Sequence, residues 1–335
     1  MFKKSGYHLF FKKLLVLIIV FALFTIFFYG CAPGKQRISI ATGGTGGTYY
    51  PYGGAMASII NKYVSGLEAS AEVTGASVEN VRLIESNESQ LALVMDDVVY
   101  HALHAQGAFD HEIELRTLLE MYPHFFHIVV HEGSQIHSIN DLAGKKVSVG
   151  APGSGTETMS NQVLEALGLT YDKFNVFRLS FTENTEGLRD RVIDAGIWSV
   201  GPPTASIMDL ATTHDIRILN FTEEELAAVQ SKYPYYLTMT LEGGTYQGVE
   251  EDIKAPSVWN SIVVGKNMPE EQAYEIVKAL IEHRDELEQV YVGASWTTPK
   301  NTIEYAIAPL HPGAVRYFKE IGLEVPDRLI PPEIK

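Results

Sequence analysis

The chain has 335 residues, of which 26 are Lys or Arg and 41 are Asp or Glu, so its formal net charge is −15. That length predicts about two domains, and the acidic balance excludes a protein that wraps duplex nucleic acid with a basic face. A single cysteine excludes an intrachain disulfide and any zinc or iron–sulfur site built from several cysteines.

The chain begins with a basic segment that turns strongly apolar. Four lysines within the first 13 residues precede an uncharged run from Leu14 to Pro33. This order predicts an export signal over residues 1–30, followed by Cys31 as the residue that carries a lipid anchor. An uncleaved membrane helix is the alternative, because a span needs about 20 residues. Both place the rest of the chain on the outer face of the cytoplasmic membrane, since the lysines stay inside.

Strand and helix patterns alternate after the signal. Strands are expected at Ile38–Thr42, Ala69–Thr74 and Leu91–Met95, with helices at Gly54–Tyr63 and Ser77–Glu85. The pattern restarts after Gly144, with strands at Lys146–Val149, Phe174–Leu179 and Ala195–Ser199, and helices at Glu157–Leu167 and Glu186–Ile193. Later helices are expected at Glu270–Arg284 and Pro312–Ile321. Such alternation is typical of βαβ units and a mostly parallel sheet.

Two long extended segments, about residues 124–131 and 257–264, lie between these series. An α/β fold of two lobes, linked by these two segments as hinge strands, fits the order. We expect one lobe to comprise residues 37–127 and 258–335, and the other to comprise residues 132–252.

The first glycine-rich loop is the richest candidate site. It runs from Gly43 to Tyr52 and leads into a helix. Glycines let the backbone approach a ligand closely, and the helix start offers free N–H groups to an anion. The expected ligand-binding residues here are Thr45, Gly46, Thr48 and Tyr49. A simple tight turn is the alternative. The loop is neither a dinucleotide fingerprint nor a Walker A motif.

A matching loop in the second series runs from Gly150 to Glu157. Either Ser154 or Thr156 can cap the next helix, and helix capping without a ligand is the alternative reading. The Gly-x-Ser-x-Gly pattern of a nucleophile elbow is absent around Ser154, which disfavours a serine hydrolase. The expected ligand-binding residues are Gly153, Ser154, Gly155 and Thr156.

Further polar and aromatic residues lie at element ends. The pair Ser77 and Asn80 begins a helix, where Ser77 either caps or contacts a ligand. The carboxylate of Asp96 follows a strand, where it binds an amine or a metal or caps the next helix. Both Trp198 and Tyr246 are positioned for a cleft, or equally for the core.

The histidines of the 124–131 segment do not form a metal set. On a strand, His127 and His131 share a face but lie about 13 Å apart, while His124 points to the other face. We expect no metal, no cofactor and no catalytic residue.

Four motifs in chain order together resemble the TAXI-type solute-binding subunits of TRAP transporters. They are Ile40–Pro51, Val73–Asn80, Lys146–Glu157 and Leu310–Ala314. The similarity runs through nearly all of residues 37–325. It implies a two-lobed periplasmic-binding-protein-like fold (type II) with a cleft between the lobes, which closes on a small solute.

The resemblance also implies a function. A small carboxylate, either a glutamate-like amino acid or a dicarboxylate, is captured and delivered to a TRAP membrane permease, in its fused form, that uses an ion gradient. The cleft would be lined by residues 46–49, Ser77, Asn80 and residues 153–156, and we expect Tyr49 and Tyr246 to close over the solute's apolar body. The protein is expected to be a monomer. The alternatives are a binding subunit of an ABC importer and, less favoured, an exported enzyme.

Overall fold

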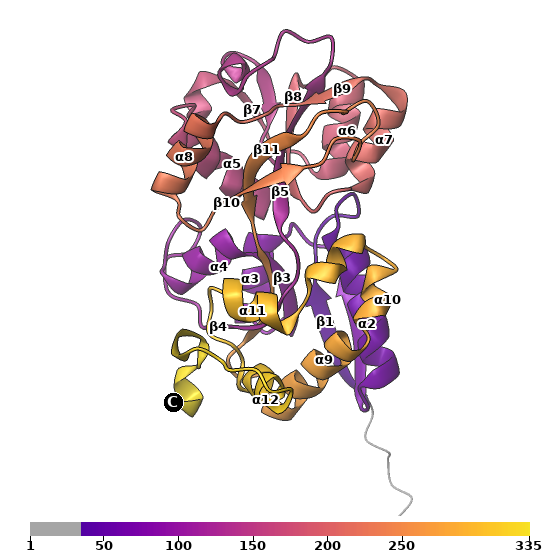
Figure 1. Cartoon of the computed structure of the whole chain (residues 1–335), viewed down its shortest axis with the longest axis vertical. Coiled ribbons are helices and arrows are strands. Elements are labelled where there is room, and N and C mark those ends of the chain that lie inside the picture. The colour runs from indigo at the N-terminus through magenta and orange to yellow at the C-terminus, as the bar shows by residue number, and fades with distance from the viewer. Residues whose placement is uncertain (1–34) are drawn as a thin grey trace, which may run out of the picture. The chain divides into compact units, whose positions relative to one another are not determined.

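The computed structural model describes residues 35–335. The expected export signal at 1–30 and the expected lipid attachment at Cys31 lie outside the described residues. Arg37–Lys335 form one compact unit, and the description below concerns this unit (Figure 1). Within the described part of the chain, no helix is both long enough and apolar enough to cross a membrane.

The first lobe is built on a five-stranded sheet in the order β2-β1-β3-β12-β4. Its strands are β1 (Gln36–Ala41), β2 (Leu67–Glu72), β3 (Leu91–Met95), β4 (Leu115–Glu120) and β12 (Asn260–Gly265). Its helices are α2 (Tyr49–Tyr63), α3 (Ser77–Glu85), α4 (Asp96–Leu103), α9 (Glu270–Glu282), α10 (Arg284–Glu288), α11 (Pro299–Tyr305) and α12 (Pro312–Glu320). Short 3-10 turns are η3 (Val292–Trp296), η4 (Asp327–Leu329) and η5 (Pro332–Ile334).

The second lobe is built on a seven-stranded sheet in the order β10-β11-β5-β8-β6-β7, with β9 paired to β5. Its strands are β5 (His124–His131), β6 (Lys146–Ser148), β7 (Asn175–Phe177), β8 (Ala195–Val200), β9 (Ile216–Ile218), β10 (Leu237–Leu241) and β11 (Ile253–Val258). Its helices are α5 (Gly155–Ala166), α6 (Phe181–Arg189), α7 (Ala205–Thr213) and α8 (Glu223–Lys232), with 3-10 turns η1 (Ile139–Leu142) and η2 (Tyr171–Lys173).

The apolar strands of the first sheet are covered on both faces. In β3, Leu91 and Leu93 pack into one hydrophobic cluster, whereas Ala92 and Val94 pack into the other. Successive side chains of a strand point to opposite faces, so an uninterrupted apolar run fits a strand that is buried on both sides. Because both faces are covered, polar groups at the end of this strand are held rigidly.

The chain passes between the two sheets twice. One crossing is residues 121–123, between β4 and β5, and the other is Trp259, between β11 and β12. The segment expected at 124–131 is extended, as β5, but it pairs within the second sheet, and the crossing lies before it at residues 121–123. The segment expected at 257–264 is instead two strands in different sheets, β11 and β12. They are separated by Trp259, whose carbonyl accepts from the N–H of Asp96 at 2.9 Å and not from a neighbouring strand of the second sheet.

Two helices begin five residues earlier than the apolar pattern predicts. The helix expected from Gly54 begins at Tyr49, and the helix expected from Glu186 begins at Phe181. The second starts early because Ser180 forms a reciprocal capping box with Glu183. Both helices therefore begin closer to the space between the lobes than the apolar pattern predicts.

Candidate functional site

A cavity of about 90 Å³ lies between the lobes. It sits between the carboxyl ends of β1 and β3 in the first lobe and those of β6, β7 and β8 in the second. Ligands of open α/β sheets bind at such ends. A cavity of this size suits a small solute.

Four helices begin at the cavity wall. They are α2, α3, α5 and α6, and each contributes its first residue or the residue before it to the lining. The first N–H groups of a helix have no partner inside the helix, and its start carries a partial positive charge. Four such starts around one small space favour an anion.

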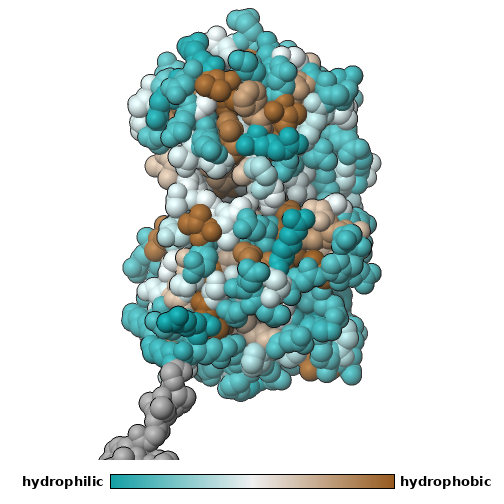
Figure 2. All heavy atoms as spheres, turned by 180° about the vertical axis from the view of Figure 1, so that it is seen from behind, coloured by the Kyte–Doolittle hydropathy of each residue, from teal (hydrophilic) through white to brown (hydrophobic). Residues whose placement is uncertain are grey.

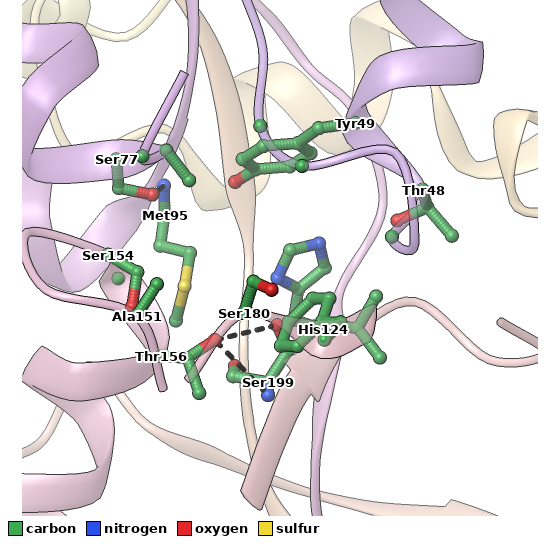
Figure 3. Close-up of a pocket in the computed structure, with 18 of the residues that line it drawn as sticks. Thr48, Tyr49, Ser77, Met95, His124, Ala151, Ser154, Thr156, Ser180 and Ser199 are labelled. Carbon is green, nitrogen blue, oxygen red and sulfur yellow. Dashed lines mark hydrogen bonds between the residues drawn. The ribbon is translucent and has the colours of Figure 1, made fainter. Parts of the chain in front are cut away.

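The second-lobe wall is built from capping hydroxyls. The Oγ of Ser154 accepts from the N–H of Glu157 at 3.1 Å, and Ser180 caps α6 in the same way. The hydroxyl of Thr156 lies 3.4 Å from both the carbonyl and the N–H of Ser199 (Figure 3). Helix starts and the end of β8 are therefore held together at the cavity.

The first-lobe wall contains one strained residue. The prediction that Ser77 caps its helix is wrong, because Ala76 is the N-cap, with φ 75°. The Ser77 hydroxyl instead accepts from the N–H of Met95 at 3.1 Å, which joins α3 to the end of β3. A positive φ at a residue other than glycine costs about 1–3 kcal/mol and clusters at functional sites.

Two titratable side chains, Tyr49 and His124, line the cavity. Their ring centroids lie 5.0 Å apart, and the Tyr49 hydroxyl donates to Oδ1 of Asn260. Burial raises the pKa of Tyr49 well above its usual range. The His124 side chain is also buried, which lowers its pKa to about 3. Neither ring nitrogen of His124 has a hydrogen-bond partner within residues 35–335.

The structure brings six of the sequence-predicted site residues to the cavity. They are Thr48, Tyr49, Ser77, Ser154, Gly155 and Thr156. The remaining seven do not line it: Thr45, Gly46, Asn80, Asp96, Gly153, Trp198 and Tyr246. Thr45 is exposed to solvent.

Three of the residues outside the lining support the cavity from behind. The amide of Asn80 donates to the carbonyls of Thr42 and Leu93, at 2.7 and 2.8 Å, and so ties β1 to β3. The carbonyls of Gly46 and Gly153 accept hydrogen bonds from the opposite lobe, from Thr204 Oγ1 at 3.2 Å and from the N–H of Val78 at 3.2 Å respectively.

The other three are buried away from the cavity. Asp96 Oδ1 accepts from Ser261 at 2.7 Å. The indole N–H of Trp198 donates to Ser206 at 3.1 Å, and the Tyr246 hydroxyl lies 3.3 Å from His127 Nε2. Because Tyr246 faces the second-lobe core, it does not close over the cavity together with Tyr49.

The lining residues that sequence reasoning missed include Thr74, Met95, His124, Ser180, Phe181 and Ser199. One signal was readable, since Ser180-Phe-Thr-Glu183 has the spacing of a capping box. No local signal marks His124, whose place depends on the crossing at residues 121–123.

The lobes touch on several sides of the cavity. Besides the contacts of Gly46 and Gly153, the Tyr236 hydroxyl donates to Asp97 Oδ2 at 2.8 Å, and Tyr291 donates to the carbonyl of Pro202 at 3.0 Å. The back face of the molecule, seen in Figure 2, is mostly hydrophilic and is hollowed between its upper and lower halves. The structure is therefore a closed arrangement of the lobes.

This architecture is the two-lobed fold of type II periplasmic solute-binding proteins, with two sheets, two crossings and a cavity between the lobes. The chain belongs to the NMT1-like family, whose model matches residues 40–322.

Solved structures with this fold share little sequence with the chain. One, from work on glutathione import via GshT and the cystine ABC importer TcyBC of Streptococcus mutans, is 13% identical, with 80% of this chain and 99% of that chain covered and a TM-score of 0.51. A protein of Bordetella bronchiseptica RB50 is 16% identical, with 90% and 91% covered and a TM-score of 0.50. The alkanesulfonate-binding protein SsuA of Xanthomonas axonopodis pv. citri is 14% identical, with 90% and 97% covered and a TM-score of 0.46.

Proposed function

We propose that the chain is an exported solute-binding subunit that captures a small carboxylate and delivers it to an importer in the membrane. The observation that carries this proposal is the cavity itself, on which four helix starts and a set of hydroxyl groups converge. A carboxylate held by N–H and hydroxyl donors needs no paired arginine. The closed lobes would be the form that the membrane subunit recognises.

The lining also indicates the chemistry of the part of the solute that does not carry the negative charge. Apolar side chains, among them Met95, Phe181 and Val200, share the wall with the hydroxyls. A short carbon skeleton fits against them, while a carboxylate faces the helix starts. The cavity volume favours a solute smaller than a tripeptide or a disulfide-linked amino-acid pair.

An ABC importer is the better-supported membrane partner. The Streptococcus mutans relative by fold comes from work on an ABC importer. A TRAP permease remains the second candidate, because four motifs from Ile40–Pro51 to Leu310–Ala314 resemble TAXI-type subunits. The export signal and the Cys31 lipid anchor belong to the same proposal, with the binding lobes outside the cytoplasmic membrane.

The binding step is tested by thermal unfolding of the purified protein in the presence of small carboxylates. A ligand at 100 times its Kd adds about 2.7 kcal/mol to the free energy of unfolding, so a melting shift of a few degrees is expected. Neutral amides of the same acids serve as matched controls and should give no shift. Equal shifts from acids and amides would contradict the anion site.

The partner is tested by uptake of the acid that binds, in cells that carry the chain and its neighbouring membrane components. An ABC importer loses uptake when cellular ATP is depleted while the ion gradient is kept. A TRAP permease loses uptake when an ionophore collapses the gradient while ATP is kept. Each result rejects one partner.

A further inference from the structure

The cavity wall carries no charged side chain. Among the described residues that line it, none is Asp, Glu, Lys or Arg. The positive ends of α2, α3, α5 and α6 face a bound solute. The carboxylates of Glu79 and Glu183 lie outside the lining, where they accept from the N–H groups of Gly75 and Ser180. A ligand cation would therefore find no counter-ion among the side chains that line the cavity.

Three buried carboxyl groups, those of Asp96, Asp97 and Glu120, lie outside the lining. Asp96 and Asp97 are 2% and 0% exposed, and their oxygens accept from Ser261 and Tyr236. Glu120 is also buried, and its Oε1 lies 2.6 Å from the same Ser261 hydroxyl. Burial raises the pKa of Asp96 and of Asp97 to about 7. None of the three reaches the cavity to pair with an ammonium group.

For an amino acid, the free energy lost when its ammonium group leaves water therefore exceeds the free energy gained from binding in the cavity. An ionised ammonium group that leaves water without a partner costs several kcal/mol. A hydroxyl or oxo oxygen in the same position carries no charge and needs only one or two hydrogen bonds. Size and shape are nearly the same in the two cases, so the discrimination depends on charge.

The imidazole of His124 is the group available to such an oxygen. The side chain is 3% exposed, lines the cavity, and has both ring nitrogens without a partner in the described part of the chain. Figure 3 shows the ring below Tyr49, near Ser180 and Ser199. Because its pKa is lowered to about 3 by burial, the ring is neutral and offers one N–H donor and one nitrogen acceptor.

We infer that the cavity selects small hydroxy acids or oxo acids over amino acids of the same size, and that His124 hydrogen-bonds to their hydroxyl or oxo oxygen. This inference rests on the proposed function, since it names the class of carboxylate that the same site takes. A buried group without a partner is costly, and a ligand oxygen removes that cost at His124. The carboxylate is left for the helix starts.

The test is calorimetric titration of the full-length chain in detergent with two sets of matched acids. One set is malate, aspartate and succinate, and the other is lactate, alanine and propionate. We expect the hydroxy acids to bind at least about 100-fold more tightly than the amino acids. They should also bind about 5- to 100-fold more tightly than the unsubstituted acids.

The variant His124→Phe should remove the preference for hydroxy acids over unsubstituted acids while it keeps the rejection of amino acids. The exposed His104 provides the matched control, and His104→Phe should leave both preferences unchanged. The titrations on the unaltered chain test the inference even if His124→Phe fails to fold.

The possible failures are distinguishable. Aspartate and alanine binding as tightly as malate and lactate would overturn the inference and leave carboxylate binding intact. Equal affinity for succinate and malate would overturn the part played by His124. Binding of none of the six acids would overturn both the inference and the proposed function.

Discussion

Asp97 is a carboxyl group placed where its charge is least stable. It is 0% exposed and accepts hydrogen bonds from Tyr236 and from the N–H of Val98, each at 2.8 Å. Burial outweighs these bonds and raises its pKa to about 7. The adjacent Asp96 is also buried.

The substitution Asp97→Asn should make the protein less sensitive to rising pH. The folded-state pKa of Asp97 lies above its unfolded value, so its stabilising contribution is complete below about pH 4 and is lost as the pH rises through 7. Asparagine keeps the shape and the hydrogen bond from Tyr236 without ionising. Three pKa units correspond to about 4 kcal/mol at most.

Urea unfolding at pH 4.5, 6 and 8 measures this effect. The unaltered protein should lose free energy of unfolding across the range, and Asp97→Asn should lose less. Asp209 is exposed and pairs with Arg189 at the surface, so Asp209→Asn is the control that should leave the slope unchanged. Parallel curves for the protein and Asp97→Asn would contradict the prediction.

The residue scale is also where sequence reasoning was least complete. Ser154 is predicted from sequence as a site residue because a serine directly before a helix is a typical capping residue. Ser77 looked the same, yet it bonds to Met95, eighteen residues away. Asp96 and Trp198 were expected near the cleft and are held inside by Ser261 and Ser206. Side-chain direction is set by such tertiary partners, which spacing does not reveal.

Among the elements, helix α5 begins in close contact with the first lobe. Its first residue, Gly155, sits so close to the first lobe that an added Cβ would lie 2.4 Å from Met95 Sδ and 2.7 Å from Ser77 Oγ. The absence of a side chain is what lets this helix start reach the cavity wall.

The substitution Gly155→Ala should therefore hold the lobes apart. We expect ligand affinity to fall by about tenfold or more, because part of the binding free energy would be spent on displacing Met95 and Ser77. The lobes themselves should stay folded, since each keeps its own core. Calorimetric titration gives the affinity, and thermal unfolding without ligand checks the fold.

Gly54 gives the matched control for this change. It lies in α2, and an added Cβ there meets no atom within 4 Å. Gly54→Ala should leave affinity unchanged and slightly raise stability, since alanine is the better helix former. Equal affinity for Gly155→Ala and Gly54→Ala would mean that the lobes close without this contact.

At the level of elements, sequence patterns predicted most strands but not their partners. The apolar run of β3 is readable because both its faces are buried. The run from Ser257 to Val264 reads in the same way, although Trp259 interrupts it. Nothing in its composition marks the point where the chain leaves one sheet for the other, because that point depends on the hydrogen bond from Asp96.

For the molecule as a whole, the two crossings define a hinge in our proposal. Residues 121–123 and Trp259 are the points where the chain passes between the sheets. Asn260, beside one crossing, accepts from Tyr49 and donates to the carbonyl of Tyr122, beside the other, at 2.7 Å. The cavity wall and both crossings are thus joined by one side chain. We propose that this side chain couples ligand contact to rotation of the lobes.

The net charge sets a further property of the whole molecule. The chain carries −15, and without residues 1–30 it would carry 22 basic against 41 acidic residues, or −19. An anion approaching from a distance is repelled by this charge, whereas inside the cavity it meets the positive helix starts. Electrostatics therefore opposes the long-range approach of the anion but favours its final binding in the cavity.

Association of a carboxylate should accordingly become faster as salt is added. The screening length falls from about 30 Å at 0.01 M to about 8 Å at 0.15 M ionic strength, which removes the distant repulsion first. We expect the association rate constant to rise by about two- to tenfold over this range, and more for the dianion malate than for the monoanion lactate. Stopped-flow fluorescence measures the association and dissociation rates separately, and dissociation should change little because the site between the lobes is screened least. A rate that falls with salt, or an equal response for both acids, would mean that the helix starts and not the net charge govern the approach.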